Sequence, residues 1–291
     1  MFSLKVACTV PGASEVQLND PQKRITEAVA LLFDTQGDLY VLDRYASPKK
    51  GRVLVFSVGP NRAWEKTMGE GVLGNVQDMT LDSHGRLHVL ERIVLPVDES
   101  RVTIFNADGT VVATWKGRFD SANGLASDGQ GHLYLSNNNV DVFTDDGVFE
   151  RELVHEASNV NAPLQYPYGM VITSSSLWAA DHFKHAIAEV VVNDGRVRSV
   201  FGSKGTGPGQ FDGNASELDA RGPTRIASDG MGNLYANDPT QNRIQKFSEQ
   251  GDFKGMFSFG RAQDVGGLVV DPFSRNIYVG RRSTVTIVCP W

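Results

Sequence analysis

The sequence predicts an all-β protein: a six-bladed β-propeller built from four-stranded antiparallel blades. Three observations lead to this prediction. The chain contains a six-fold internal repeat, the copies are spaced by residue numbers mostly in the mid-forties, and each copy consists of short apolar strands separated by turn residues. A repeat of that length, made of four short strands, is typical of a propeller blade rather than of a helical solenoid.

The repeat is clearest in one strand of each copy, which carries an aromatic residue or a histidine at its centre. The copies of this strand are GDLYVLD, GRLHVLE, GHLYLSN, SSLWAAD, GNLYAND and RNIYVGR, with Tyr40, His88, Tyr134, Trp178, Tyr235 and Tyr278 at the shared position. Successive spacings are 48, 46, 44, 57 and 43 residues, so one copy carries an insertion. We expect this column, His88 included, to pack inside the blades.

A second short strand precedes the aromatic one in every copy, and a third follows it. The preceding strand is small and apolar, as in VALLFD and GLVVD, which suits strands that converge on an axis and are covered on both faces. Turns such as Asp108-Gly109 and Asp146-Gly147 follow the third strand and indicate hairpins.

The sixth copy ends at Trp291, before a fourth strand. We expect the N-terminal segment 2–10 to supply that strand and to close the ring, which would remove an exposed sheet edge. The prediction is therefore one domain over residues 1–291, with blades at about 28–71, 76–119, 122–159, 167–212, 223–263 and 265–291 plus 2–10.

The chain has two cysteines, Cys8 and Cys289. If segment 2–10 pairs with the last strand, Cys8 lies at the far end of its strand from Cys289. At about 3.3 Å per residue the two sulfur atoms would be too far apart to bond. This pairing predicts two free thiols.

Composition excludes some classes of function. Apolar residues make up 41% of the chain, and the net charge is −6, which makes nucleic acid an unlikely partner. No apolar run approaches the roughly 18 residues that cross a bilayer, and the N-terminus lacks the layout of a secretory signal. We expect no membrane association, a monomer, and the cytoplasm over other compartments.

The repeat resembles the NHL-repeat family of six-bladed propellers. The fifth copy is the most similar: it has GTGPGQF before the blade, GNLY in the aromatic strand and Asn242-Arg243-Ile244 opening the third strand. The resemblance covers essentially the whole chain. It implies the fold, but it leaves the function open, because such propellers serve as enzymes, readers of peptides or nucleic acids, and scaffolds.

Two columns of residues are expected on one face, around the axis. The column before the innermost strands is Val29, Gln77, Asn123, Tyr168, Thr224 and Gly266. The column ending the aromatic strands is Asp43, Glu91, Asn137, Asp181, Asp238 and Arg281. In three copies the acid of the second column is matched by an arginine that opens the next strand, and we expect the pairs Asp43–Arg52, Glu91–Arg101 and Asp238–Arg243.

The fourth copy departs from this pattern, because Asp181 faces His185 in place of an arginine. The neighbouring Arg44, Arg92, Arg225 and Arg282 add positive charge to the same rim. Such a patch would suit a carboxylate or phosphate ligand; the alternative is a solvated rim of mixed charge. His182 and His185 are three residues apart, but that spacing across a loop fixes no metal geometry.

Two families of propeller enzymes resemble the chain in part. Calcium-dependent lactonases use a Glu, two Asn and an Asp around the axis, and Asn123 matches one Asn, while Glu27 and Asp78 lie near two other positions. In the fourth blade, Tyr168 stands where that family has Asp. Zinc lyases of this fold use three histidines, of which only His185 is matched. The candidate metal ligands are therefore Glu27, Asp78 and Asn123, and a metal cofactor, if there is one, would be calcium or zinc.

The leading hypothesis is a recognition module that binds a small ligand, a peptide or a protein on the axial face. The candidate contacts are Gln77, Asn123, Tyr168, Asp181, His185 and Arg225. The alternative is a metal-dependent lactonase-type hydrolase or lyase at the axial mouth, with His185 as its base. The glycine-rich run 202–213 is expected to connect blades four and five rather than to bind phosphate, and segment 214–222 to overhang the mouth.

Overall fold

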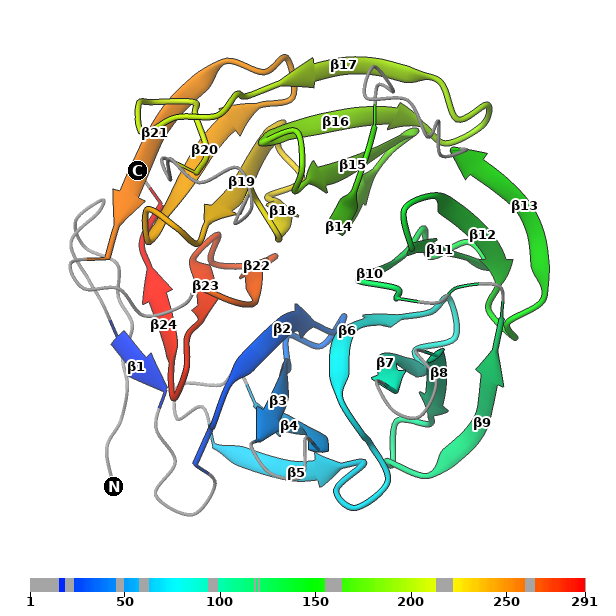
Figure 1. The fold of residues 1–291 in the computed structure, drawn as a ribbon. Coiled ribbons are helices and arrows are strands. Elements are labelled where there is room, and N and C mark those ends of the chain that lie inside the picture. The colour runs from blue at the N-terminus through cyan, green and yellow to red at the C-terminus, as the bar shows by residue number, and fades with distance from the viewer. Residues whose placement is uncertain are drawn as a thin grey trace.

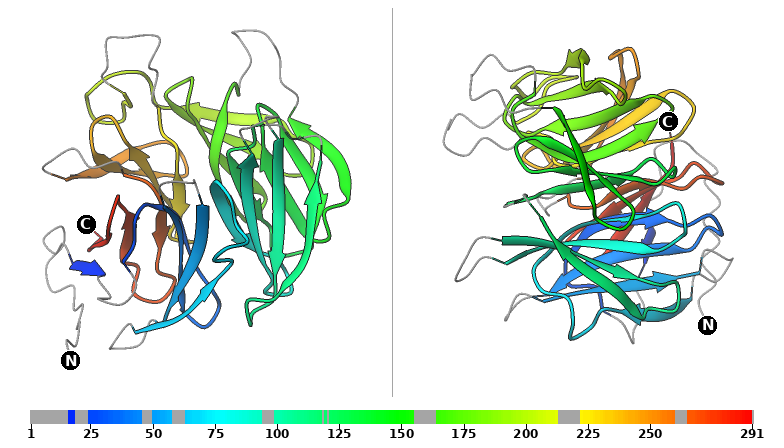
Figure 2. Two further views of the ribbon diagram at one scale, coloured as in Figure 1. Left: turned by 60° about the horizontal axis from the view of Figure 1, so that its bottom comes forward. Right: turned by 90° about the vertical axis from the view of Figure 1, so that its right-hand side faces the viewer.

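The computed structural model shows a six-bladed β-propeller (Figure 1). It describes residues 16–18, 24–45, 50–57, 63–93, 99–117, 119, 121–154, 164–212, 222–259 and 265–290. Within these residues every regular element is a strand, and the strands form six four-stranded antiparallel sheets. Side views show the sheets arranged around the axis (Figure 2). None of the described elements is a helix long and apolar enough to cross a membrane.

Each sheet runs from an innermost strand at the axis to an outer strand at the rim. The innermost strands are β2 (Ala28–Phe33), β6 (Val76–Leu81), β10 (Gly124–Ser127), β14 (Pro167–Thr173), β18 (Ile226–Ser228) and β22 (Leu268–Val270). The second strands are β3 (Leu39–Tyr45), β7 (Leu87–Ile93), β11 (His132–Ser136), β15 (Ser176–Asp181), β19 (Asn233–Asp238) and β23 (Ile277–Gly280). The third strands are β4 (Lys50–Phe56), β8 (Glu99–Phe105), β12 (Val140–Thr144), β16 (Ala186–Val191), β20 (Arg243–Ser248) and β24 (Val285–Val288). The outer strands are β5 (Trp64–Met68), β9 (Val111–Lys116), β13 (Phe149–Val154), β17 (Val197–Phe201), β21 (Phe253–Ser258) and β1 (Val16–Leu18).

An N-terminal strand closes the ring, as the missing fourth strand of the last copy predicts. Strand β1 pairs antiparallel with β24, with Val16 opposite Ile287 and Leu18 opposite Val285. The closing strand lies later in the chain than expected, and segment 2–10 falls outside the described residues. An N-terminal strand does close the ring, as expected. The paired stretch is only three residues long, so several N-terminal segments could form it, and the sequence pattern did not indicate which one does.

The prediction of two free thiols is wrong. Cys289 is disulfide-bonded, and Cys8 is the only other cysteine of the sequence. The prediction placed Cys8 within the strand that pairs with the last blade. Residues 16–18 form that strand instead, so the argument that kept the two sulfur atoms apart does not apply.

The aromatic column is buried, as predicted, and it is tied to the turn that precedes it. Tyr40, Tyr134, Trp178, Tyr235 and Tyr278 are all at most 6% exposed. His88 is fully buried, and its Nε2 lies 2.9 Å from Oδ2 of Asp82. In the fourth blade the indole Nε1 of Trp178 donates to Oγ1 of Thr173. A polar residue at the end of the innermost strand thus satisfies Nε2 of His88 and Nε1 of Trp178, whereas Nδ1 of His88 has no hydrogen-bond partner among the described residues.

The glycine-rich run connects blades four and five and is folded against blade five. The guanidinium of Arg243 donates to the carbonyl oxygens of Thr206, Gly207 and Gln210 at 2.8 to 3.1 Å. The amide of Gln245 donates to the same Gln210 oxygen. The carbonyls of the run therefore accept hydrogen bonds from the neighbouring blade, which confirms that the run is a structural connection. Its expected extension 214–222 lies outside the described residues except for Gly222.

Candidate functional site

A cavity of about 270 Å³ opens at one end of the axis. We call it the axial mouth. Its lining residues are Glu27, Val29, Arg44, Gln77, Tyr168, His182, Thr224, Arg225, Pro239, Val265 and Gly266. Every member of the column predicted before the innermost strands, except Asn123, lines this cavity. The sequence pattern therefore located the mouth correctly from the blade register.

A second set of lining residues follows the ends of the second strands. Arg44, His182 and Pro239 each come directly after an acid that ends the strand pattern: Asp43, Asp181 and Asp238. Successive side chains of a strand point to opposite faces, and the three acids are fully buried. The residue after each acid is therefore the one available to the mouth. The sequence pattern indicated Asp181 as a contact and Arg44 as a rim charge, but it did not indicate His182 or Pro239 as contacts.

One wall of the mouth is aromatic. The ring of Tyr168 lies 4.7 Å from that of His182 and 5.6 Å from that of Tyr166, measured between centroids. The His182 Nδ1 lies 3.2 Å from the carbonyl oxygen of Gly222, which orients the imidazole. Burial raises the pKa of Tyr168, so its hydroxyl is neutral and can donate a hydrogen bond at physiological pH. This wall offers a flat apolar surface with a polar atom at its edge.

The opposite side carries a salt bridge within blade one. Arg44 forms a two-pronged pair with Glu27, with Nε donating to Oε2 at 2.9 Å and Nη2 to Oε1 at 2.5 Å. The backbone N–H groups of Thr26 and Glu27 donate to the buried carboxylate of Asp43, which fixes the segment that carries Glu27. The carboxylate of Glu27 is thus held by an arginine on the same blade.

Arg225 lies across the floor of the mouth. It comes from blade five, and its Nη2 donates to the carbonyl oxygen of Gln77 in blade two at 2.6 Å, while Nε donates to that of Val29 in blade one at 3.1 Å. Its Nη1 lies 3.6 Å from Oδ2 of Asp78, and the two side chains are 13% and 11% exposed. The guanidinium of Arg225, expected on the rim, is therefore turned inward and paired with Asp78.

A second cavity lies below Arg225. It has a volume of about 210 Å³ and is lined by residues from all six innermost strands or the residues that flank them, including Met79, Leu125, Met170 and Leu268. We call this second cavity the channel. Arg225 lines both the channel and the mouth. The side chain of one arginine thus separates the two spaces.

The mouth brings together three of the six predicted contacts, Gln77, Tyr168 and Arg225. Asn123 is 95% buried, and its Nδ2 has no hydrogen-bond partner among the described residues. His185 is also buried, with its Nδ1 3.7 Å from Oδ2 of Asp212, and burial lowers the pKa of His185. Its backbone has a left-handed φ of 54°, like Asn242 at the matching position of blade five. Neither Asn123 nor His185 lines the mouth.

Asp181 is buried beneath the aromatic wall. Its carboxylate accepts hydrogen bonds from the backbone N–H groups of Gln165, Tyr166 and Lys184 at 2.8 to 3.3 Å. The first two donors lie in the segment that leads to Tyr168. Asp181 therefore holds the aromatic wall from behind and does not reach the cavity.

The acid column has the structural role that the sequence indicated for three blades. The expected pairs are present, with Asp43–Arg52, Glu91–Arg101 and Asp238–Arg243 each at 3.0 Å. In blade five a neutral residue, Asn237, supplies the equivalent acceptor for the incoming chain, and its Oδ1 accepts from the N–H groups of Thr224 and Arg225. These bonds place the residues that line the mouth.

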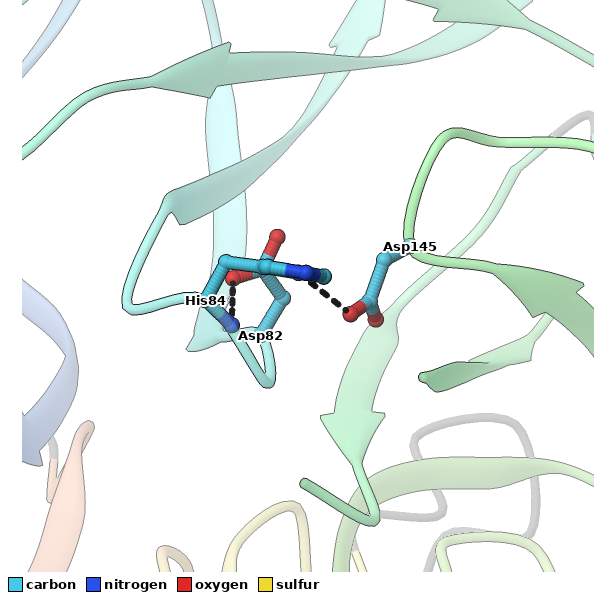
Figure 3. A group of neighbouring side chains, drawn as sticks. All are labelled: Asp82, His84 and Asp145. Atoms are coloured by element: carbon cyan, nitrogen blue, oxygen red, sulfur yellow. Dashed lines mark hydrogen bonds and ion pairs between the residues drawn. The ribbon is translucent and has the colours of Figure 1, made fainter. Parts of the chain in front are cut away.

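A separate group of titratable side chains lies between blades two and three. Asp82, His84 and Asp145 offer ligand atoms within 4.8 Å of one another (Figure 3). However, both oxygens of Asp82 already accept two hydrogen bonds each, from the N–H groups of His84 and Arg86, from the Arg86 guanidinium and from His88. The adjacent Arg86 also disfavours a second cation. We interpret this group as a support for the turn.

Comparisons with known proteins give likenesses of structure only. No family model matches the sequence, and no curated protein matches it. The chain is similar to a catalytically inactive virginiamycin B lyase from Staphylococcus aureus solved with quinupristin, at a TM-score of 0.64 and 14% identity over 96% of this chain and 99% of that one. It is also similar to U3-55K, at 0.66 and 12% over 96% and 99%, and to a chain of a nidogen/laminin complex, at 0.64 and 19% over 83% of each. At these identities the likeness shows the fold alone, and the chain is a six-bladed β-propeller.

Proposed function

We propose that the protein is a recognition module that binds a planar group of a small molecule or peptide in its axial mouth. The observation that carries this proposal is the aromatic wall of Tyr168 and His182, which faces a cavity with polar side chains from three other blades. Cavities that combine apolar walls with a few placed polar groups are the usual form of ligand sites.

The chemistry of the lining favours a planar ligand with a neutral acceptor over a free anion. A flat ring can stack on Tyr168, where the ring face gives apolar contact and the hydroxyl a hydrogen bond. The positive charges of Arg44 and Arg225 are already balanced by Glu27 and Asp78. An amide or ketone oxygen would accept hydrogen bonds here without adding a net charge to a partly buried site. An aromatic residue of a peptide has both features.

The competing proposal, a metal-dependent hydrolase or lyase, has weaker support. It would need Glu27 and Asp78 as oxygen ligands of calcium or zinc, and each carboxylate is engaged by an arginine. His185, the residue expected to act as its base, does not line the mouth. The residues present therefore do not fit an axial metal centre.

We also propose that the blades are NHL-like repeats. The support is the arginine of the Asn-Arg-Ile motif: Arg243 is 4% exposed, pairs with Asp238 and binds three carbonyls of the glycine-rich run. The resemblance depends on the GTGPGQF run and on the Asn-Arg-Ile motif, and hydrogen bonds from Arg243 join these two segments.

The binding proposal can be tested with simple aromatic amides. N-acetyl-tryptophanamide and, as a non-aromatic comparison, N-acetyl-leucinamide are added to the purified protein and followed by saturation-transfer NMR. We expect transfer to the indole ring, no comparable transfer to the leucine compound, and about tenfold weaker binding for Tyr168→Ala, the effect of losing one stacked ring and its contact area.

Phe183→Ala is the matched control. Phe183 is an aromatic residue next to His182, is 59% exposed and does not line the mouth. Its replacement should leave binding unchanged. Equal loss in both variants, or transfer to the leucine compound as strong as to the indole, would show that the mouth is not an aromatic site.

A further inference from the structure

The guanidinium of Arg225 lies among oxygen atoms on the propeller axis. It donates to the carbonyl oxygens of Gln77, Val29 and Thr224, at 2.6, 3.1 and 3.4 Å. The carboxylate of Asp78 lies 3.6 Å from its Nη1. Backbone carbonyls and a carboxylate are the ligands that calcium selects in proteins. The surroundings of Arg225 are therefore those of a hard cation.

Asp78 depends on a nearby positive charge. Its carboxylate is largely buried and accepts hydrogen bonds from the backbone N–H groups of Met79 and Leu125, both at 3.0 Å. Burial raises the pKa of Asp78, and the charge of Arg225 opposes that shift. A buried carboxylate that loses its partner must take up a proton or another cation, because an unpaired charge is strongly disfavoured in a protein interior.

The position of Arg225 also determines the form of the axial space. Its side chain borders both the mouth and the channel beneath. The N–H groups of Thr224 and Arg225 are held by Asn237, so the arginine starts from a fixed backbone position in blade five and reaches blades one and two. It joins three blades at the point where they converge.

We propose that Arg225 is the resident cation of the propeller axis. Its guanidinium fills an oxygen-lined position that a divalent cation such as calcium would otherwise take, and it makes the axial centre independent of metal. Removal of the guanidinium should leave Asp78 and the carbonyl oxygens of Val29 and Gln77 facing a space that calcium and water can fill.

The test is calcium binding by isothermal titration, after chelator treatment, to the full chain and its variants. The wild-type protein and Asp78→Asn should give the same titration, because neither has an axial calcium site. Arg225→Ala should gain about one calcium per chain, with a dissociation constant on the order of 10⁻⁴ M, as expected for a site with few protein ligands. The double variant Arg225→Ala with Asp78→Asn should lose the gained site.

Two further variants make every outcome decisive. Arg225→Gln removes the charge while keeping a long side chain, and it should also gain calcium; Arg225→Lys keeps the charge and should not. The proposal is overturned if wild-type protein binds calcium through Asp78, if neither neutral variant gains a site, or if both stay unfolded with and without calcium. None of these results bears on aromatic amide binding at Tyr168, so the two proposals fail separately.

Discussion

The rings of Tyr168 and His182 lie 4.7 Å apart, and a single buried carboxylate holds the chain on both sides of the pair. Asp181 accepts hydrogen bonds from Gln165 and Tyr166 before the first ring and from Lys184 after the second. The aromatic wall of the mouth is therefore built on one residue that the cavity does not contain. The sequence marked Asp181 as a candidate contact, and the structure gives it a position behind the contacts.

Replacing Asp181 by alanine should weaken both stability and binding. Three partly buried N–H groups would lose their acceptor, and a donor left without a partner costs about 1–3 kcal/mol when it is fully buried and less when water reaches it. We expect the free energy of unfolding in urea to fall by about 1–3 kcal/mol for the three groups together, and aromatic amides to bind more weakly. Asp194→Ala is the control, because Asp194 is an exposed turn residue. A similar loss in both variants would refute the positioning role.

Gly124 should tolerate no side chain. A Cβ at this residue would lie 1.9 Å from the carbonyl oxygen of Tyr168, so blades three and four would have to separate. Gly124→Ala should therefore destabilise the protein by about 3 kcal/mol or more, the upper range for overpacking. Gly74→Ala is the control, because its nearest contact would be at an ordinary 3.4 Å. Thermal unfolding of the two variants decides the matter, and equal midpoints would contradict the close approach.

The blade pattern could be predicted from sequence because it repeats six times. The aromatic column and the column before the innermost strands both follow from register, and the structure places five of the six residues of the latter column in the cavity. The repeat did not predict in the same way that the residues directly after the acids, such as His182 after Asp181, line the mouth. Whether Asp181 or His182 faces the axis depends on which side of the strand is buried, and both side chains are polar.

Long-range contacts were also beyond the pattern. Arg225 reaches carbonyl oxygens of residues in blades one and two, and nothing local to Arg225 indicates which way it turns. The positions of Asn123 and His185 depend on packing between adjacent blades, which a single blade repeat does not describe. The position of the closing strand was not predicted for a related reason: the short edge of the last blade can pair with many segments of similar composition.

His88 should make the protein less stable in mild acid. Burial lowers the pKa of His88, against the opposing hydrogen bond with Asp82. The unfolded chain takes up a proton near pH 6.5 whereas the folded chain does not, so stability is present above that pH and is lost as the pH falls, by at most about 1.4 kcal/mol per unit.

The variant that tests this is His88→Tyr, because tyrosine fills the same position in four other blades. Its unfolding free energy should fall less than that of wild type between pH 7.5 and 5.5. His84→Tyr serves as the control, because His84 has a 71% exposed side chain. If His88→Tyr and wild type lose the same free energy over this interval, His88 is not the titrating group.

Cys289 should be unreactive until the protein is reduced. It is disulfide-bonded, and a disulfide sulfur is not a thiolate and does not react with an alkylating agent. Iodoacetamide added under denaturing conditions should label no cysteine without reductant and two with it. Reduction should lower the stability by about 2–4 kcal/mol, the usual contribution of one such bond. Labelling of the unreduced chain would contradict the assignment.

The central claim is that a planar group binds in the axial mouth, and residue-resolved NMR tests it most directly. Backbone amide shifts are followed while N-acetyl-tryptophanamide is added to the wild-type protein. We predict that the largest changes lie at Tyr168, His182 and Arg225, with Ser175 and Gly230 on distant turns unmoved. Changes centred on those turns, or no saturable change at Tyr168, would contradict the account.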